Sequence, residues 1–353
     1  MGRPVGVEGG LVAQQCRSAA AAAAVVAPSR CSVEAAAASW KWESGSDSCD
    51  SGGGNPPCSS CSWDSVGGLD AQQLGVLQKV ASRGVFWQHP SLPVAKVYGL
   101  QYGGDVEADG NCLFTAVQRA MQLKEAPVEI RLATVRRFVD DYEAADAEEK
   151  ERLDRIIKNL YSPDMSTGWG VHVVQEVKLL AKKTDREALE TEIEEMIQVG
   201  MSRESAIESV YNEHCLRVCD ACSWAKYMSI SGQATDEYDI VTLLYTEEGL
   251  LSVEMNAEGK AAAFGDDIAI QALASEFQRQ LFVVQVHGKD GSAENSEGLI
   301  FFLPHSPRQE ISHPPVFLLM RGTGWCGAGG DHYEPILAKL LPVVSKEKAA
   351  YIL

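Results

Sequence analysis

The sequence places a cysteine in a setting that suits nucleophilic chemistry. Cys112 follows a polar turn that contains Gly110 and Asn111, and the apolar residues after it recur with helical spacing. A cysteine at the start of a helix lies beside unpaired backbone N–H groups and the positive end of the helix dipole, which favours the thiolate. The backbone of residues 109–112 could also hold an oxyanion during acyl transfer. This stretch therefore predicts both a nucleophile and an oxyanion hole.

A matching general base is expected far away in the sequence, because cysteine hydrolases bring base and nucleophile together by folding. His332 stands where the glycine-rich loop 322–330 meets a predicted strand, residues 331–337. Glu334 follows two positions later, so in a strand it points to the same face and can accept a hydrogen bond from the imidazole. His332 would take the proton of Cys112, and Glu334 would orient the imidazole.

Three separate blocks of the sequence resemble the ovarian tumour (OTU) family of cysteine proteases, which remove ubiquitin from proteins. The blocks are residues 109–114 (DGNCLF), residues 264–274 (FGDDIAIQALA) with the strand after them, and residues 332–334 (HYE). The resemblance runs from about residue 102 to about residue 341, with long stretches between the blocks that cannot be aligned. Three blocks in this order are far more specific than any one of them.

The resemblance implies roles for individual residues. It makes Cys112 the nucleophile and His332 the general base, and it adds Asp109, which matches the aspartate that opens the cysteine motif. Glu334 falls where the family usually has an aspartate or asparagine, and it is longer by one methylene. Phe264 replaces the more usual tryptophan in an apolar support. None of these roles requires a metal or a cofactor.

The same resemblance implies a fold and an activity. The expected fold class is α/β (α+β) of the papain type, with a central sheet flanked by helices and the nucleophile at a helix N-terminus. The expected activity is that of a thiol-dependent deubiquitinase, which hydrolyses isopeptide bonds after the C-terminal glycine of ubiquitin. Two alternatives stay open: a catalytically weak protein that binds ubiquitin, and a protease for a ubiquitin-like modifier. The motifs specify neither linkage preference nor oligomeric state.

Composition narrows the partners and the compartment. The chain has 353 residues, 45% of them hydrophobic, and a net charge of -18. This acidity argues against nucleic acid and anionic membranes as partners and suits basic ones, such as the arginine-bearing tail of ubiquitin. The ten cysteines are irregularly spaced and no signal-like segment is evident, which predicts a reducing compartment, the cytoplasm or the nucleus. The longest run of small apolar residues, 19–27, is too short to span a membrane.

Composition also divides the chain. Residues 1–68 are rich in Ala, Ser and Gly and are predicted to be disordered, with an organelle transit peptide as the rival interpretation. Residues 69–342 are predicted to form the catalytic domain, with a helical insertion around 143–222, and residues 343–353 a C-terminal tail. Within the insertion, the stretch 171–182 is predicted to be helical.

Three features have two explanations each. Residues 187–215 predict a helical hairpin with a glycine turn, which is similar to the first two helices of a ubiquitin-associated module but is also typical of a plain scaffold. Cys215, Cys219 and Cys222 would share one face of a helix, which suits a core face or a soft metal ion. Cys326 is a rival nucleophile, but no helical pattern follows it.

Overall fold

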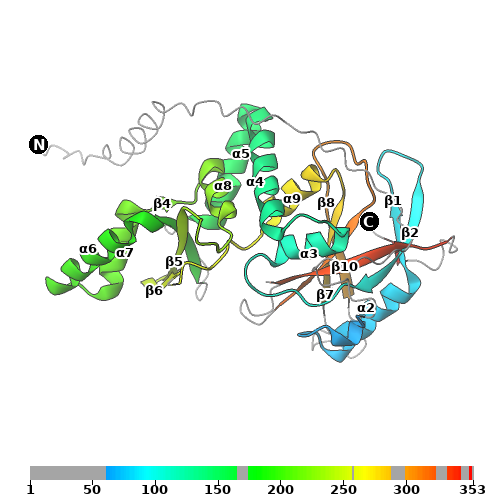
Figure 1. The fold of residues 1–353 in the computed structure, drawn as a ribbon, viewed down its shortest axis with the longest axis horizontal. Coiled ribbons are helices and arrows are strands. Elements are labelled where there is room, and N and C mark those ends of the chain that lie inside the picture. Colours follow the sequence, from blue (N-terminus) through cyan, green and yellow to red (C-terminus); the bar gives the residue numbers. More distant parts are fainter. Residues whose placement is uncertain are drawn as a thin grey trace, which may run out of the picture. The chain divides into compact units, whose positions relative to one another are not determined.

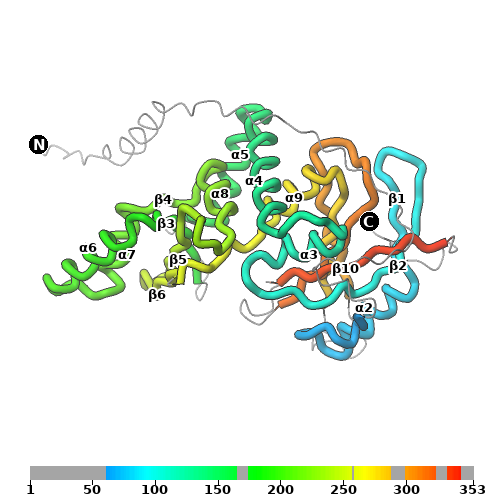
Figure 2. Tube along the Cα trace, in the orientation of Figure 1, coloured from blue at the N-terminus to red at the C-terminus, as the bar shows by residue number. Residues whose placement is uncertain are grey.

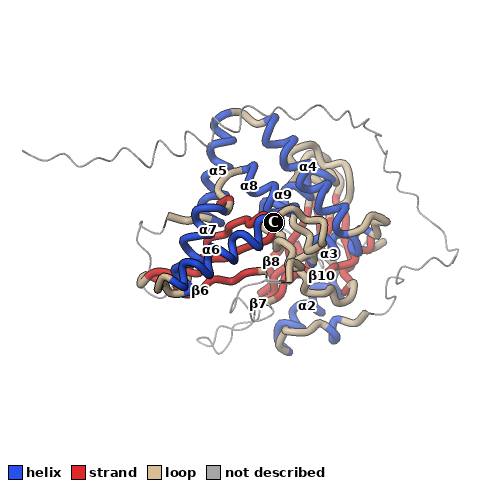
Figure 3. The backbone as a smooth tube through the Cα atoms, turned by 60° about the vertical axis from the view of Figure 1, so that its left-hand side comes forward, coloured by secondary structure: helices blue, strands red, loops and turns tan. Residues whose placement is uncertain are grey.

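A computed structural model describes most of the chain after residue 60. The described ranges are residues 61–164, 174–256, 258–287, 299–322, 332–342 and 350–351. They all belong to the second of two units into which the chain divides, Asn55–Leu353. The fold is mixed α and β, as the sequence predicts, but it contains two sheets where one central sheet was expected (Figures 1 and 3).

The larger sheet has seven strands. In sheet order they are β11 (Ala350–Tyr351), β1 (Val85–Gln88), β2 (Ala95–Tyr102), β10 (His332–Leu340), β9 (Val316–Arg321), β7 (Leu281–His287) and β8 (Leu299–His305). β10 is antiparallel to both β2 and β9, whereas β7 and β9 are parallel. The strand that carries His332 therefore lies inside the sheet, beside a strand from the other end of the described chain (Figure 2).

Both faces of this sheet are covered, and the alternation of side chains along β7 explains how. Leu281 and Val283 enter a core with α3 (Cys112–Met121) and α9 (Asp267–Glu276), whereas Phe282 and Val284 enter a core with α2 (Ala71–Arg83). Successive residues of a strand point to opposite faces, so a continuous apolar run is buried on both sides. Helix α2 lies on one face and α3 on the other (Figure 1).

Local signals set the helix ends. Asp70 and Gln73 form a capping box at the start of α2. Gly84 ends that helix with a φ of 78°, and a Cβ there would lie 2.8 Å from a methyl of Val97. Asp266 caps α9 by accepting a hydrogen bond from Ala269 N–H. The helices α4 (Pro127–Ala144), α5 (Ala147–Tyr161) and α8 (Ala221–Ser229) complete the core around α3 and α9.

The smaller sheet begins within the predicted insertion, 143–222, and extends past its expected end. Its order is β4 (Leu216–Arg217), β3 (Gln175–Lys182), β5 (Tyr238–Thr246) and β6 (Gly249–Met255), all antiparallel. The helices α6 (Arg186–Gln198) and α7 (Arg203–His214) form the predicted hairpin and pack on this sheet through their own apolar core. Two short 3₁₀ turns, η2 (Trp63–Ser65) and η3 (Lys183–Asp185), precede α2 and α6.

The predicted helix at 171–182 is wrong where the structure describes it, because residues 175–182 form β3. Val177 and Leu179 point into the core beneath the hairpin, and Leu180 points into the core of the larger sheet. A strand buried on both faces has too little polar alternation to be distinguished from a helix by pattern. The insertion is therefore mixed α and β rather than helical.

The limits of the packed region also differ from those predicted. Val66 is buried against α2, so the packed chain begins before residue 69, within the segment predicted to be disordered. Ala350 in the predicted tail pairs with Val85 of β1. Residues 1–60, predicted to be disordered, lie outside the described residues. No helix in the described ranges combines the length and apolarity that a bilayer crossing requires.

Candidate active site

The turn before Cys112 depends on Gly110. Its φ is 84°, and a Cβ there would lie 2.6 Å from the carbonyl oxygen of Ala262. Only glycine adopts this conformation without strain and tolerates so close a backbone approach. Cys112 is the first residue of α3, as the sequence predicts. A loop from elsewhere in the chain is thus pressed against the turn that presents the cysteine.

Asp109 and Asn111 stabilise the turn in different ways. Asp109 Oδ1 accepts a hydrogen bond of 2.9 Å from the backbone N–H of Asn111, which closes the turn. The Asn111 side chain does not cap α3 but donates to the Ser231 carbonyl at 3.0 Å. Because the Asn111 N–H is already bonded, the amides of Gly110 and Cys112 are the better candidates for oxyanion donors.

Cys112 is buried, with 2% of its surface exposed. Burial raises the pKa of its thiol, although the backbone N–H groups of Tyr333 and Leu113 and the charge of Arg131 act to lower it. The sequence predicted a stabilised thiolate, and this expectation is wrong for the resting structure because desolvation outweighs the donors at the helix N-terminus. The protonated thiol is the favoured resting form at neutral pH.

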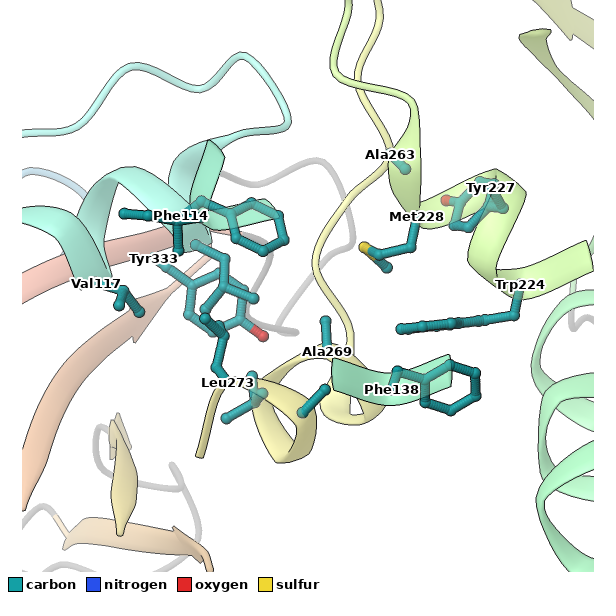
Figure 4. Packing of buried hydrophobic residues seen from close by; sticks show 14 of the residues in the cluster. Phe114, Val117, Phe138, Trp224, Tyr227, Met228, Ala263, Ala269, Leu273 and Tyr333 are labelled. Carbon is teal, nitrogen blue, oxygen red and sulfur yellow. The ribbon is translucent and has the colours of Figure 1, made fainter. Parts of the chain in front are cut away.

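His332 begins β10, the strand against which α3 packs, and it is 1% exposed. The next residue, Tyr333, is buried in the same core as Cys112, and its backbone N–H acts to lower the pKa of the Cys112 thiol. Phe114 and Val117 of α3 lie around Tyr333 in the same apolar core (Figure 4). Folding therefore joins the cysteine segment to the histidine segment across 220 positions, taken as the difference between 332 and 112.

The 264–274 block meets the other two at the same place. The ring of Phe264 stacks on that of Tyr333, with centroids 5.6 Å apart and an interplanar angle of 27°. A Cβ on Gly265 would lie 2.9 Å from Cβ of Leu113, so this glycine lets the block approach the start of α3 closely. Phe264 is thus an apolar support for the strand that carries the histidine.

Glu334 lies next to His332 but bonds to other groups. Its Oε1 is 3.7 Å from His332 Nε2, longer than a hydrogen bond, and 2.7 Å from Arg321 Nη2. Its Oε2 is 2.9 Å from the hydroxyl of Tyr102, which also lies 2.7 Å from Asp105 Oδ1. Glu334 is fully buried, and Arg321 balances its charge. The expected bond from His332 is therefore replaced in this structure by a network that fixes the carboxylate beside the imidazole.

Arg131 of α4 is the most deeply buried cation near the site, and it was not predicted from the sequence. Its side chain is 0% exposed and lies 4.3 Å above the ring centroid of Phe114. Its nitrogens donate to Asn111 Oδ1 and to the carbonyls of Gly110, Met228 and Ala263, at 2.8 to 3.0 Å. The Arg131 side chain thus links the turn before Cys112 to the segments that contain Met228 and Ala263.

Weak sequence signals existed for these residues. Arg131 is seven positions before Phe138, so on a helix both lie on the same face, and a charge on an apolar face indicates a buried partner. Arg321 ends an apolar strand and pairs in register with His332. Tyr102 ends β2, a strand that was not predicted from the sequence. Only the fold shows that Tyr102 and Arg321 meet Glu334.

The three cysteines around α8 do not form the predicted site in the described part of the chain. Cys215 follows the end of α7, and Cys219 and Cys222 lie before and within α8, so the predicted shared helix face is wrong. In the part of the chain that the structure describes, no group of three or more His, Cys, Asp or Glu side chains is placed to hold a metal ion. Cys326 lies outside the described residues.

Comparisons with known proteins do not assign the chain to a family. No protein-family model matches the chain, and a search of curated proteins finds no match either. The arrangement of the residues themselves therefore carries the functional argument.

Proposed function

We propose that this chain is a cysteine hydrolase of the OTU type that releases ubiquitin from conjugated proteins. The single observation that carries the proposal is that Cys112 and Tyr333, the residue that follows His332, are buried in the same core, where α3 packs against β10. The three sequence blocks that resemble the OTU family converge around this point through Phe264 and Leu113. A cysteine with only a structural role would not require the strand that carries His332, the buried Glu334 and the 264–274 block to lie at the same place.

The proposed chemistry assigns one role to each group. His332 takes the thiol proton as Cys112 attacks the carbonyl of the terminal glycine of ubiquitin. The amides of Gly110 and Cys112 hold the oxyanion, and the imidazolium gives its proton to the departing lysine amine. Water, activated by the same imidazole, then hydrolyses the thioester and regenerates the thiol. Glu334 holds the imidazole in position during both steps.

A ubiquitin probe with an electrophilic C-terminus tests the proposal. We expect the full chain to form a covalent adduct with the probe, at Cys112 by peptide mapping, and to cleave di-ubiquitin. C112A should lose both activities and keep the wild-type thermal unfolding temperature. An adduct at a different cysteine, or full cleavage by C112A, would refute the nucleophile assignment. Probes that carry the tails of ubiquitin-like modifiers, used side by side, identify the modifier, and a panel of di-ubiquitins gives the linkage preference.

One observation favours a second candidate, a ubiquitin-binding protein of low catalytic activity. Cys112 and His332 are both almost fully buried, and burial raises the pKa of the thiol, so the resting site disfavours the thiolate. A binder of this kind would retain di-ubiquitin on a column without labelling by the probe. Labelling within minutes at equimolar probe would exclude it.

A further inference from the structure

We propose that the buried guanidinium of Arg131 is the fixed counter-charge of the Cys112 thiolate, acting through the turn that precedes the nucleophile. This inference rests on the proposed role of Cys112 as nucleophile. It assigns Arg131 as a positioning residue of the site rather than a catalytic one, because its hydrogen bonds go to the turn before Cys112 and to the backbone of two other segments.

The contacts of Arg131 place its charge against the turn that precedes Cys112. Its Nη2 donates to the Gly110 carbonyl at 2.8 Å and its Nε to Asn111 Oδ1 at 3.0 Å, so it holds the two residues that precede Cys112. Its ring contact is to Phe114, two residues after Cys112. These hydrogen bonds fix the position of the planar guanidinium. Its charge is also fixed, because a guanidinium keeps its proton even when it is buried.

This charge is unusual in having no acidic partner at contact distance. All the oxygens that accept hydrogen bonds from Arg131 are neutral, namely three backbone carbonyls and the amide of Asn111. Among the described residues, no carboxylate forms an ion pair with Arg131. A buried charge without a paired opposite charge is costly to a fold, which indicates that it serves another purpose here. A thiolate formed at Cys112 would supply the missing negative charge.

The other titratable groups that face Arg131 do not replace this role. Asp109 before α3 and Asp236 before β5 attract it only at longer range, and Tyr227 of α8 is held neutral because burial raises its pKa. Burial lowers the pKa of Arg131 to about 10, so it stays charged at neutral pH. Around Cys112, Arg131 favours the thiolate and Asp109 opposes it.

The test measures the ionisation of Cys112 without ubiquitin. We would follow the rate of Cys112 alkylation by iodoacetamide against pH in the full chain, by peptide mass spectrometry because the chain has ten cysteines. H332A is the background, so that the imidazole does not contribute. R131Q removes the charge but keeps an amide donor, and R131K keeps a charge. We expect R131Q to raise the alkylation midpoint by about one to two pH units, and R131K to leave it near the parent value.

The sign of the shift separates a charge effect from a loss of packing. Burial raises the pKa of Cys112, so a loosened turn would lower the midpoint and speed alkylation, opposite to the effect of losing Arg131. An unchanged or lowered midpoint in folded R131Q would overturn the proposal. If R131Q does not fold, R131K tests the proposal. A lower melting temperature with an unchanged alkylation midpoint of Cys112 supports the proposal, because the charge remains. An alkylation midpoint that rises although the charge remains overturns the proposal. A chain that never cleaves ubiquitin could still show these shifts, so the two proposals fail separately.

Discussion

Arg321 and Glu334 form an ion pair within the seven-stranded sheet, with 2.7 Å between Nη2 of the guanidinium and Oε1 of the carboxylate. The same oxygen lies 3.7 Å from His332 Nε2, so a single carboxylate oxygen faces both the arginine and the imidazole. The Tyr102 hydroxyl holds the other oxygen at 2.9 Å. Glu334 is thus fixed from two neighbouring strands, and His332 can form its bond to Glu334 through a small movement.

Removing the charge of Glu334 should damage stability and activity separately. E334Q leaves the Arg321 guanidinium without its counter-charge, so we expect the free energy of unfolding in urea to fall by about 3 to 5 kcal/mol. We also expect kcat/KM on a ubiquitin substrate to fall at least about tenfold, because the imidazole loses its orienting carboxylate. The matched control is the double variant R321M/E334Q, which removes both charges. It should regain most of the stability and none of the activity; equal losses of stability in the single and double variants would contradict the ion-pair argument.

Substitution of Gly110 should be far more harmful than substitution of an exposed helical glycine. G110A introduces a Cβ at 2.6 Å from the Ala262 carbonyl and at a φ of 84°, so we expect a loss of about 2 to 4 kcal/mol in unfolding free energy and no probe labelling. A Cβ on Gly75 in α2 would meet no other atom within 4 Å, and G75A should stabilise the protein by about 0.5 to 1 kcal/mol. Chemical denaturation of both variants checks the pair. Wild-type stability of G110A would show that the turn can rearrange.

Alkaline pH should weaken the fold through Cys215. Burial raises the pKa of this thiol from 9.0 to about 12. The native state therefore keeps a proton that the unfolded state has lost, and this contribution, complete below pH 9, disappears as the pH rises toward 12. We expect the urea midpoint of the wild type to fall between pH 9 and pH 10, before most tyrosines of the unfolded chain ionise. C215A should show a smaller fall over that interval, and a parallel fall in both proteins would rule out Cys215 as the source.

The hairpin tip offers a test of the ubiquitin-contacting interpretation of α6 and α7. Val199 is 85% exposed and Met201 is 41% exposed, while the helices on either side carry many glutamates. We expect V199D/M201D to raise the KM for di-ubiquitin several-fold while kcat and the melting temperature stay unchanged, because the exposed tip makes little contribution to the core. L299D, a change of an exposed apolar residue in β8, is the control. An unchanged KM in V199D/M201D would assign the hairpin to the scaffold.

Local patterns predicted the elements that carry the proposed chemistry. The helix after Cys112, the strand at His332 and the hairpin all follow from spacing and turn residues, which are properties of neighbouring positions. What the sequence could not provide was the environment of each group. The burial that raises the pKa of Cys112 and the ion pair that holds Glu334 depend on segments more than a hundred positions away or on a neighbouring strand.

The misassigned elements have a common physical origin. β3 is buried on both faces, so its sequence lacks the polar alternation that identifies a strand, and the helices around it favoured a helical interpretation. The sequence does not predict the role of Arg131, because charged residues in helices usually face solvent, whereas this one bonds to backbone carbonyls of three other segments. At β3 and at Arg131, long-range contacts produce a structure that differs from the one predicted by the neighbouring residues.

The position of β10 between β2 and β9 affects when the site can form during synthesis. The ribosome releases β1, β2 and α3 long before β10, yet β10 alone joins β2 to the rest of the seven-stranded sheet. A nascent chain that stops before residue 332 would carry the cysteine and lack the strand that completes both sheet and site. Assembly of the sheet and completion of the proposed site therefore occur together, and an unfinished chain would lack that site.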